Sequence, residues 1–327
     1  MKHIAIAALL ALTAPAVQAA DIILSNDNNA VGVKGQTFDL LAAEITKRLG
    51  DGTTVEVHHS GSLFDQKTQI QGLQLGSATL IAPTSGIYAT MAPGVSALTL
   101  PFLLSTPEQV QEAMQDETVR AAFLPDFEAK NIVPVAVWMN GPRELSYKGD
   151  KAILLPEDMA GVKVRVQSVP SDIAAMNAVG ANVIAMSWSE VPTALQQGVI
   201  DAVEPTANAL SGAGLVEIID QMTKFGYQYS FYIVGANKTW WDGMSESDRA
   251  AVQEALDVAT AWNFENAAKE NAAGYQEVID AGKPVNELTP EQRAAWAEAM
   301  KPVWKEFGDD VVGEAAMARL REIGGVN

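Results

Sequence analysis

Hydrophobic and polar residues repeat with two different periods along the chain. Segment 161–168, GVKVRVQS, has a valine at every second position, the pattern of a strand with one buried face. In segment 37–50, TFDLLAAEITKRLG, apolar residues such as Phe38 and Leu41 recur at helical spacing, and Gly50 is a typical residue for a helix end. Strands and helices of this kind alternate through the first two thirds of the chain. Their alternation predicts an α/β protein built from βαβ units with mostly parallel sheets.

The strand–helix pattern starts twice, which predicts two α/β lobes joined near residues 138–146. From Trp240 onward the sequence is nearly all helical, and such a tail could bridge or brace both lobes. We expect lobe I to comprise residues 21–142 with about 231–270, and lobe II to comprise residues 143–230 with about 271–327.

The first 20 residues have the features of a cleaved secretory signal peptide. Lys2 precedes an apolar run from Ile4 to Leu12, and small residues follow around Ala19. This run is too short to span a bilayer. The sequence contains no Cys, so it offers neither a lipid-anchor cysteine nor a disulfide framework. Export in a cysteine-free form favours the bacterial periplasm as the location of the mature protein.

The charge balance restricts the classes of partner. The chain carries 22 basic and 40 acidic residues, a formal net charge of −18. Such a molecule is repelled by nucleic acid and by anionic lipid, which argues against both as partners. An anionic ligand would have to be attracted locally, by a few cations placed inside a cleft.

Most common enzyme motifs are absent from the sequence. It contains no G-x-S-x-G, no H-E-x-x-H and no G-x-x-x-x-G-K-[ST], and it has no thiol nucleophile. His58 and His59 are adjacent on a predicted strand, so they face opposite sides and cannot share one metal ion. We therefore expect no metal and no cofactor. An enzyme that uses carboxylates alone for acid/base work stays open.

Arg165 is the first candidate for anion binding. It stands at the end of the predicted strand, and segment 170–180 begins a helix directly after it. Buried valines would hold the strand in the core and keep the guanidinium fixed. Ser171 is a candidate N-cap, and the first turn of its helix can offer N–H groups to an anion. The structural alternatives are a solvated strand face and an ordinary capped helix.

Four other residues are candidates for a ligand site because of where they stand. Trp188 follows a strand at a turn into a helix, where the carboxyl ends of parallel strands face the ligand crevice. Arg143 lies at the expected lobe junction, and Glu204 and Asn208 follow the strand VIDAVE. The structural alternatives are a packing tryptophan, a surface arginine and polar loop residues.

Segment 161–204 resembles the DctP-type solute receptors of tripartite ATP-independent periplasmic (TRAP) transporters. That family typically shows G-x-K-[IV]-R-V, a helix ending LGAN, an aromatic-Ser-Glu-Val element, ALQ-x-G and [IV]-D-G-x-E. The matching stretches are, in order, 161–166, 179–182, 188–191, 194–198 and 200–204. Segments 58–88 and 98–106 also look like family segments, so the resemblance covers nearly the whole mature chain.

The resemblance implies a two-lobed, type II-like periplasmic binding protein with hinge strands and a long C-terminal helix bridging the lobes. It implies that Arg165 pairs with a substrate carboxylate, that Arg143 is the family's second frequent arginine and that Trp188 packs on the substrate. Many relatives read E-N-P-x-x-N where this chain reads E-P-T-A-N, which makes Asn208 a candidate for the family's asparagine. Glu204 would serve either the ligand or a metal, as in the oxo-acid branch of the family, and the proline that follows it weakens the metal alternative.

These inferences predict a receptor and not an enzyme. We expect it to capture a small organic acid in an interlobe cleft of a periplasmic monomer and to deliver it to a TRAP membrane permease. The acid stays open between a dicarboxylate, a sugar acid, an oxo-acid, an aromatic acid and a sulfonate. The alternative functions are a receptor of an ATP-driven importer, an exported carboxylate-dependent hydrolase or isomerase, and a periplasmic scaffold or chaperone.

Overall fold

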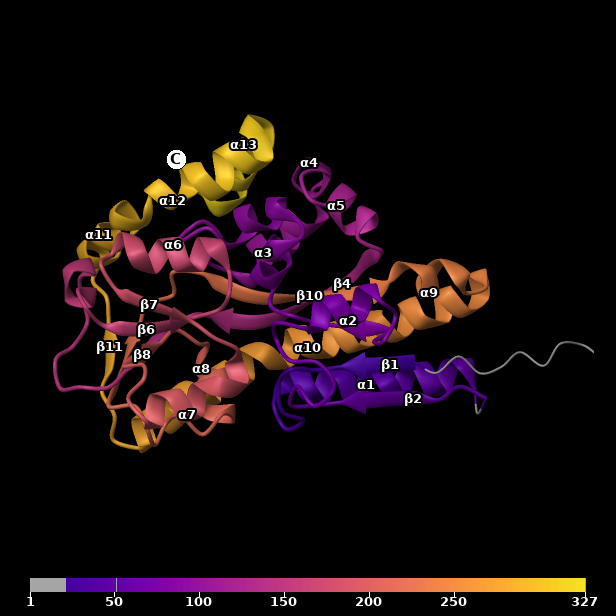
Figure 1. Ribbon diagram of the computed structural model, residues 1–327, viewed down its shortest axis with the longest axis horizontal. Coiled ribbons are helices and arrows are strands. Elements are labelled where there is room, and N and C mark those ends of the chain that lie inside the picture. Colours follow the sequence, from indigo (N-terminus) through magenta and orange to yellow (C-terminus); the bar gives the residue numbers. More distant parts are fainter. Residues whose placement is uncertain (1–21, 51, 327) are drawn as a thin grey trace, which may run out of the picture.

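A computed structural model describes residues 22–50 and 52–326 of the chain (Figure 1). The predicted signal peptide lies outside these residues. The strands are β1 Ile22–Ser25, β2 Val55–His58, β3 Leu80–Ile81, β4 Ile132–Pro142, β5 Leu145–Tyr147, β6 Lys163–Val166, β7 Asn182–Ala185, β8 Ala202–Val203, β9 Gln221–Lys224, β10 Tyr229–Asn237 and β11 Val285–Glu287.

The α-helices are α1 Val33–Leu49, α2 Gln69–Gln74, α3 Pro107–Gln115, α4 Glu117–Ala121, α5 Leu124–Ala129, α6 Pro170–Ala178, α7 Val191–Gln196, α8 Ala207–Gly212, α9 Lys238–Gly243, α10 Glu246–Asp280, α11 Pro290–Met300, α12 Pro302–Trp304 and α13 Asp310–Gly324. The 3₁₀-helices are η1 Ser85–Thr90, η2 Pro93–Thr99, η3 Pro156–Met159 and η4 Trp188–Glu190, and η5 Lys305–Asp309 is a π-helical turn. None of the helices in the described part of the chain is both long and apolar enough to cross a membrane.

The strands form two sheets, which confirms the expected α/β fold with two lobes. The first sheet has the order β2-β1-β3-β10-β4, and the second has the order β11-β9-β5-β8-β6-β7. The βαβ strands pair in parallel, as β1 does with β2 and β3, and β6 with β7 and β8. The strands of the crossing segments, β4, β5, β9 and β10, pair antiparallel with one another and with their neighbours β3 and β8. The sheets are therefore mixed and not simply parallel.

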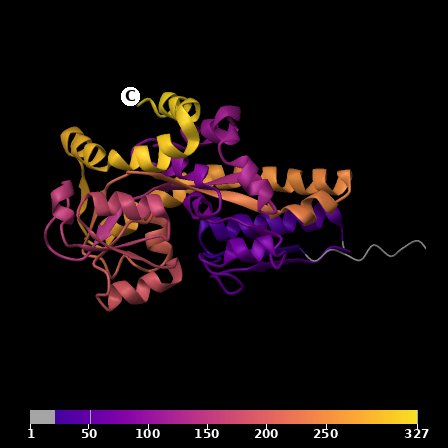
Figure 2. The ribbon, with the colours of Figure 1, turned by 45° about the horizontal axis from the view of Figure 1, so that its top comes forward.

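Two stretches of chain cross between the sheets. β4 of the first sheet leads through Arg143 and Glu144 into β5 of the second, and β9 of the second sheet leads back into β10 of the first. The 35-residue helix α10 runs alongside these crossings (Figures 1 and 2). It contacts α1 and β4 at one end and α8 and β11 at the other. The expected long bridging helix is confirmed.

The hydrophobic pattern of the sequence places the core of the first sheet correctly. Phe38, Leu41 and Ile45 of α1 are fully buried, and the Phe38 ring meets that of Trp138 edge-on, with 5.0 Å between their centroids. The helix ends before Gly50, whose φ of +88° favours glycine.

One local expectation is wrong. Helix α6 begins at Pro170 after Val169, so Ser171 lies inside the first turn and does not cap it. Proline is favoured at a first helical position because its missing N–H would have no helical partner there. The C-terminal tail is nearly all helical, as expected, and the short strand β11 within it pairs in parallel with β9 and extends the second sheet.

The C-terminal helix α13 packs on the first sheet's side of the molecule, although β11, which precedes it in the chain, belongs to the second sheet. α13 contacts α3, α4 and η2, which belong to the polypeptide around the first sheet (Figure 2). We propose that the two sheets are the cores of the two lobes and that α13 is packed on the first.

Helix α10 approaches the backbone of both lobes closely. Asn263 accepts a hydrogen bond from the Met139 N–H through Oδ1 at 2.6 Å, where β4 carries an irregularity in its pairing with β10. Asn271 donates to the carbonyl of Asn140 on the same strand. At Gly274 an added Cβ would lie only 2.5 Å from the carbonyl oxygen of Ala207 in α8. A glycine is needed there because the two helices nearly touch.

We expect Gly274→Ala to lower the melting temperature of the protein. Alanine normally stabilises a helix interior by up to ~1 kcal/mol relative to glycine. Here the methyl group would push α10 off α8, at a cost of about 1–3 kcal/mol as for other overpacked sites. Circular dichroism during heating measures the effect. The control is Gly243→Ala at the end of α9, where nothing lies within 4 Å of the added Cβ. Equal melting temperatures of the two variants would contradict the close-approach argument.

Candidate functional site

Two adjoining cavities lie where the loops of both sheets meet. The first, which we call the arginine cavity, has a volume of about 40 Å³ and is lined by Arg143 and Arg165. The second, the lysine cavity, has a volume of about 30 Å³ and is lined by Lys34. Both are lined by Asn28, Trp188, Ala209 and Tyr232, so the two cavities adjoin, and together we call them the cleft. Each cavity has room for only a few water molecules in this arrangement of the two sheets.

The topology explains why polar residues gather in this cleft. Asp27 follows β1, Thr84 follows β3, Gln167 follows β6 and Glu204 follows β8, and all four line the arginine cavity. The carboxyl ends of parallel strands meet at one edge of a sheet, and ligand crevices form there in open α/β folds. The cleft therefore lies where the two sheets present their strand ends to each other.

Arg165 is held firmly but has no carboxylate partner among the residues that the structure describes. Val164 and Val166 on either side of it are fully buried, and they anchor β6 in the core. The Nε and Nη2 atoms of Arg165 donate to the Met186 carbonyl at 3.1 and 2.8 Å, and Nη2 also donates to Oε1 of Gln66 at 3.0 Å. Within residues 22–50 and 52–326, Arg165 forms no ion pair with Asp or Glu. Its side chain is nevertheless buried, with 3% of the residue exposed.

Burial has a clear effect on the charge of this guanidinium. It lowers the pKa of Arg165 to about 10, and the positive charge of Arg143 acts in the same direction, whereas Glu204 and Asp172 oppose it. The group stays protonated at neutral pH. A buried charge without a counterion is unfavourable, so this site is suited to an anion.

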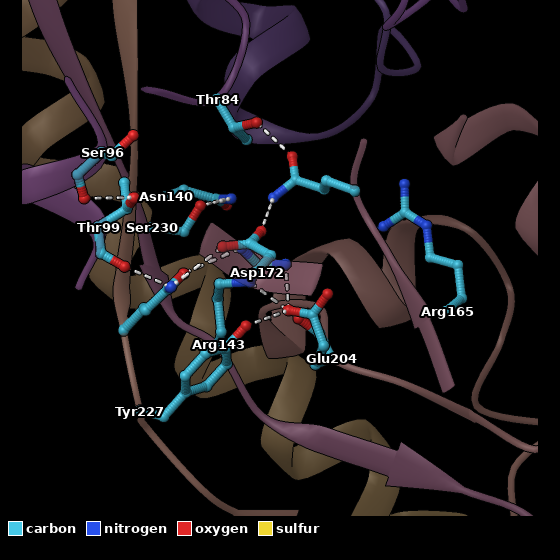
Figure 3. Close-up of polar contacts among 12 residues, drawn as sticks. Thr84, Ser96, Thr99, Asn140, Arg143, Arg165, Asp172, Glu204, Tyr227 and Ser230 are labelled. Atoms are coloured by element: carbon cyan, nitrogen blue, oxygen red, sulfur yellow. Dashed lines mark hydrogen bonds and ion pairs between the residues drawn. The ribbon is translucent and has the colours of Figure 1, made fainter. Parts of the chain in front are cut away.

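Arg143 is embedded in a cluster of acidic groups, in contrast to Arg165 (Figure 3). Its Nη1 lies 2.8 Å from Oδ2 of Asp172, and its Nη2 pairs with the Glu204 carboxylate. Its Nε donates to the Glu204 carbonyl at 3.1 Å. Although burial alone disfavours its charge, the carboxylates of Glu204 and Asp172 raise the pKa of Arg143. This guanidinium is already neutralised by the protein itself.

Glu204 is buried on the side of the cluster that faces the arginine cavity. The Tyr227 hydroxyl donates to its Oε2 at 3.0 Å, while Oε1 is buried and has no hydrogen-bond partner among the atoms that the structure describes. Burial raises the pKa of Glu204 to about 7, against the opposite influence of Arg143. An acceptor in this condition can take a hydrogen bond from a ligand.

Trp188 and Asn208 line the cleft from the second lobe. The Arg165 guanidinium lies over the Trp188 ring, 5.4 Å from its centroid. Asn208 is the second residue of α8, and its Nδ2 donates to Oε2 of Glu270 at 2.6 Å. The structure thus brings all five sequence-predicted site residues to the cleft: Arg143, Arg165, Trp188 and Glu204 line the arginine cavity, and Trp188 and Asn208 line the lysine cavity.

Several cleft residues were not found from the sequence. Gln167 lies on the same face of its strand as Arg165, and the alternation in GVKVRVQS could have identified it. Gln66 comes from the other lobe and touches both Arg165 and Gln167, and no sequence signal connects them. Lys34 and Asp27 form a buried ion pair. Lys34 lines the lysine cavity, and Asp27 lines the arginine cavity. In the described ranges no group of three or more His, Asp or Glu side chains is arranged to hold a metal ion.

Comparisons with known proteins agree with this architecture. Residues 25–310 match the family model DctP, described as bacterial extracellular solute-binding protein, family 7. The C4-dicarboxylate-binding periplasmic protein DctP of Rhodobacter capsulatus is 31% identical over 283 residues, which cover 86% of this chain and 83% of that protein. The 2,3-diketo-L-gulonate-binding periplasmic protein YiaO of Escherichia coli is 28% identical over 271 residues, which cover 82% of this chain and 80% of that protein.

A solved structure extends the likeness to the whole fold. A TRAP periplasmic solute-binding protein from Shewanella oneidensis, crystallised with bound succinate, superposes with a TM-score of 0.89 at 26% identity. The superposition covers 94% of this chain and 99% of that one. The match of the family model and of these relatives over most of their lengths shows that the chain belongs to the DctP family, family 7 of the bacterial extracellular solute-binding proteins.

Proposed function

We propose that this protein is a periplasmic receptor that binds a small organic acid in the cleft and delivers it to a TRAP membrane permease. The observation that carries the proposal is Arg165: a buried, fixed guanidinium without a carboxylate partner among the described residues, in a chain with a net charge of −18. A carboxylate from solution would complete this site. Family membership supports the receptor function and the periplasmic location, and it gives no support to the alternative of an enzyme.

The guanidinium of Arg165 suits a carboxylate ligand better than a compact cation such as a lysine ammonium would. A guanidinium offers paired N–H donors that match the two oxygens of a carboxylate. The Met186 carbonyl and the Gln66 amide already orient the group, so little side-chain freedom is lost when a ligand arrives. We propose that the ligand carboxylate accepts from Nη1 of Arg165, the terminal nitrogen that neither Met186 nor Gln66 engages, and that Trp188 packs on the rest of the molecule.

Contacts between the lobes suggest how binding would be linked to closure. Gln66 of the first lobe contacts Arg165 and Gln167 of the second. Ser187 donates to Oδ2 of Asp65 at 3.1 Å, and Asn29 donates to the Gly212 carbonyl at 2.7 Å. All of these contacts break if the lobes separate. A ligand held between them would favour the closed arrangement, and closure shapes the surface that a permease would meet.

We assign Arg143 a supporting role in this site. Its charge is matched by Asp172 and Glu204, so a second ligand carboxylate would gain little from it. We propose that Arg143 holds these two acidic side chains in place and thereby shapes the cavity wall. Asn208 would act similarly from α8, through its hydrogen bond to Glu270.

A thermal-shift screen of small organic acids tests the receptor function directly. A ligand present at about 1,000 times its dissociation constant stabilises the folded state by about 4 kcal/mol. We expect at least one carboxylate from a panel of dicarboxylates, sugar acids, oxo-acids and aromatic acids to raise the melting temperature by several degrees. Calorimetry then gives the affinity. If no acid raises the melting temperature, the proposed function is wrong.

We expect Arg165→Ala to abolish most binding and to leave the fold intact. A charge-assisted paired hydrogen bond contributes about 1.5–3 kcal/mol, so the affinity should fall at least about tenfold. Arg165→Lys retains the charge and loses the guanidinium geometry, so its affinity should lie between that of the unchanged protein and that of Arg165→Ala. Calorimetry measures the affinities, and Arg249→Ala on α10, outside the cleft, is the control. An unchanged affinity of Arg165→Ala would remove this residue from the site.

Arg143→Ala should act mainly on stability. The substitution leaves Asp172 and Glu204 buried without their cation, and breaking such a buried pair costs about 3–5 kcal/mol. Thermal melting without ligand should therefore show a much larger loss for Arg143→Ala than for Arg165→Ala, which strands no carboxylate. Equal melting temperatures of the two variants would contradict this division of roles.

A further inference from the structure

The positive charges of the cleft are distributed unevenly between paired and unpaired groups. Lys34 forms an ion pair with Asp27, and both side chains are 4% exposed. Arg143 pairs with Asp172 and Glu204. Among the cations that line the two cavities, only Arg165 has no carboxylate partner in the part of the chain that the structure describes. The cleft therefore offers one unmatched positive charge and not two.

The acidic groups of the cleft are more numerous than its cations. Glu270 of α10 reaches the lysine cavity, where its Oε1 accepts from the Val33 N–H at 2.7 Å and its Oε2 accepts from Asn208. Three cations thus face four carboxylates around the cleft: Lys34, Arg143 and Arg165 against Asp27, Asp172, Glu204 and Glu270. A ligand carboxylate bound at Arg165 makes the surroundings more negative still.

Away from Arg165, the described residues that line the arginine cavity offer hydrogen-bonding groups and no cation without a carboxylate partner. The Glu204 Oε1 is a buried acceptor with no partner in the described residues, and Asn140, Thr206 and Ser230 line the same cavity. Figure 3 shows Glu204 between Arg143 and Arg165, so a ligand anchored on Arg165 passes close to it. Ligand hydroxyl groups would satisfy this oxygen, whereas a second carboxylate would be repelled by it.

From this arrangement we infer that the cleft selects a hydroxylated monocarboxylate, such as a sugar acid, and discriminates against dicarboxylates. The single carboxylate binds Arg165, and a hydroxyl group donates to Oε1 of Glu204. This inference rests on the proposed receptor function and narrows its ligand class. The inference requires only that the ligand carry one carboxylate and at least one hydroxyl group.

Matched pairs of acids test the selectivity. Glycerate and tartronate, threonate and tartrate, gluconate and glucarate, and galactonate and galactarate differ within each pair only in a terminal CH₂OH or carboxylate. Calorimetry at pH 8 keeps Glu204 ionised, since burial raises its pKa to about 7. In every pair that binds, we expect the monocarboxylate to bind at least about tenfold more tightly.

The outcomes separate this inference from the function on which it rests. If dicarboxylates, including succinate, bind as tightly as or more tightly than their matched monocarboxylates, the inference is wrong and the receptor function stands. If none of the wider panel of acids binds, both are wrong.

Asp27→Asn probes the charge balance itself. The substitution removes the carboxylate that pairs with Lys34, so that a second ligand carboxylate no longer has to compete with an internal one for this lysine. We expect the preference for the monocarboxylate to shrink by at least about tenfold, through tighter binding of the dicarboxylate. The control is Asp150→Asn, an identical change at an exposed position far along the chain, which should leave the preference unchanged. An unaltered preference in a folded Asp27→Asn protein would overturn the inference.

Glu204→Gln gives a second measurement should Asp27→Asn fail to fold. It removes a negative charge from the arginine cavity and retains the side-chain shape. The relative affinity for the dicarboxylate should again rise, and a fall or no change would count against the inference.

Discussion

The candidate site depends on one positive charge that is held inside the protein without a carboxylate counterion among the residues that the structure describes. Arg165 is almost fully buried, and within the described part of the chain its N–H groups donate only to a main-chain carbonyl and an amide oxygen. Burying an unpaired charge is unfavourable, so this arrangement persists only where the surroundings are rigid. A mobile chain would move the guanidinium to water or to an acidic side chain. The fully buried Val164 and Val166 supply this rigidity, since they fix β6 in the core on both sides of the arginine.

The fold supplies the second half of the site from a different lobe. Gln66 reaches Arg165 only because the crossing strands and α10 bring the loops of the first sheet over the strand ends of the second. Helix α10 is joined to these crossings by Asn263 and Asn271, and it approaches α8 so closely at Gly274 that a side chain has no room. A rotation about the crossings would therefore change the distance from Gln66 to Arg165, and this is the kind of movement that closes a two-lobed receptor.

The sequence predicted local structure and strand-end residues well because both depend on short-range patterns. Arg165 and Trp188 were found from their positions after strands, and α1 from its apolar spacing. Contacts between distant segments were not predictable: nothing in the sequence indicates that Asp172 and Glu204 meet at Arg143, or that Asp27 pairs with Lys34. Ser171 does not cap its helix because the fixed φ of Pro170 suits the first helical position, and β11 is not predictable from the sequence because three residues are too few to show a period.

Membership of the family does not determine which acid is bound, because in the proposed site any carboxylate could pair with Arg165. Selectivity must come from the groups that meet the remainder of the ligand, and here these are carboxylates and neutral polar groups. A receptor that used Lys34 for a second ligand carboxylate would have to leave this lysine unpaired in the empty state, as Arg165 is. Instead Asp27 occupies it, and burial acts to lower the pKa of Lys34 while Asp27 acts to raise it. A dicarboxylate would then have to displace an internal carboxylate from its cation, exchanging one ion pair for another and burying an additional negative charge, whereas a hydroxyl group needs only the free oxygen of Glu204.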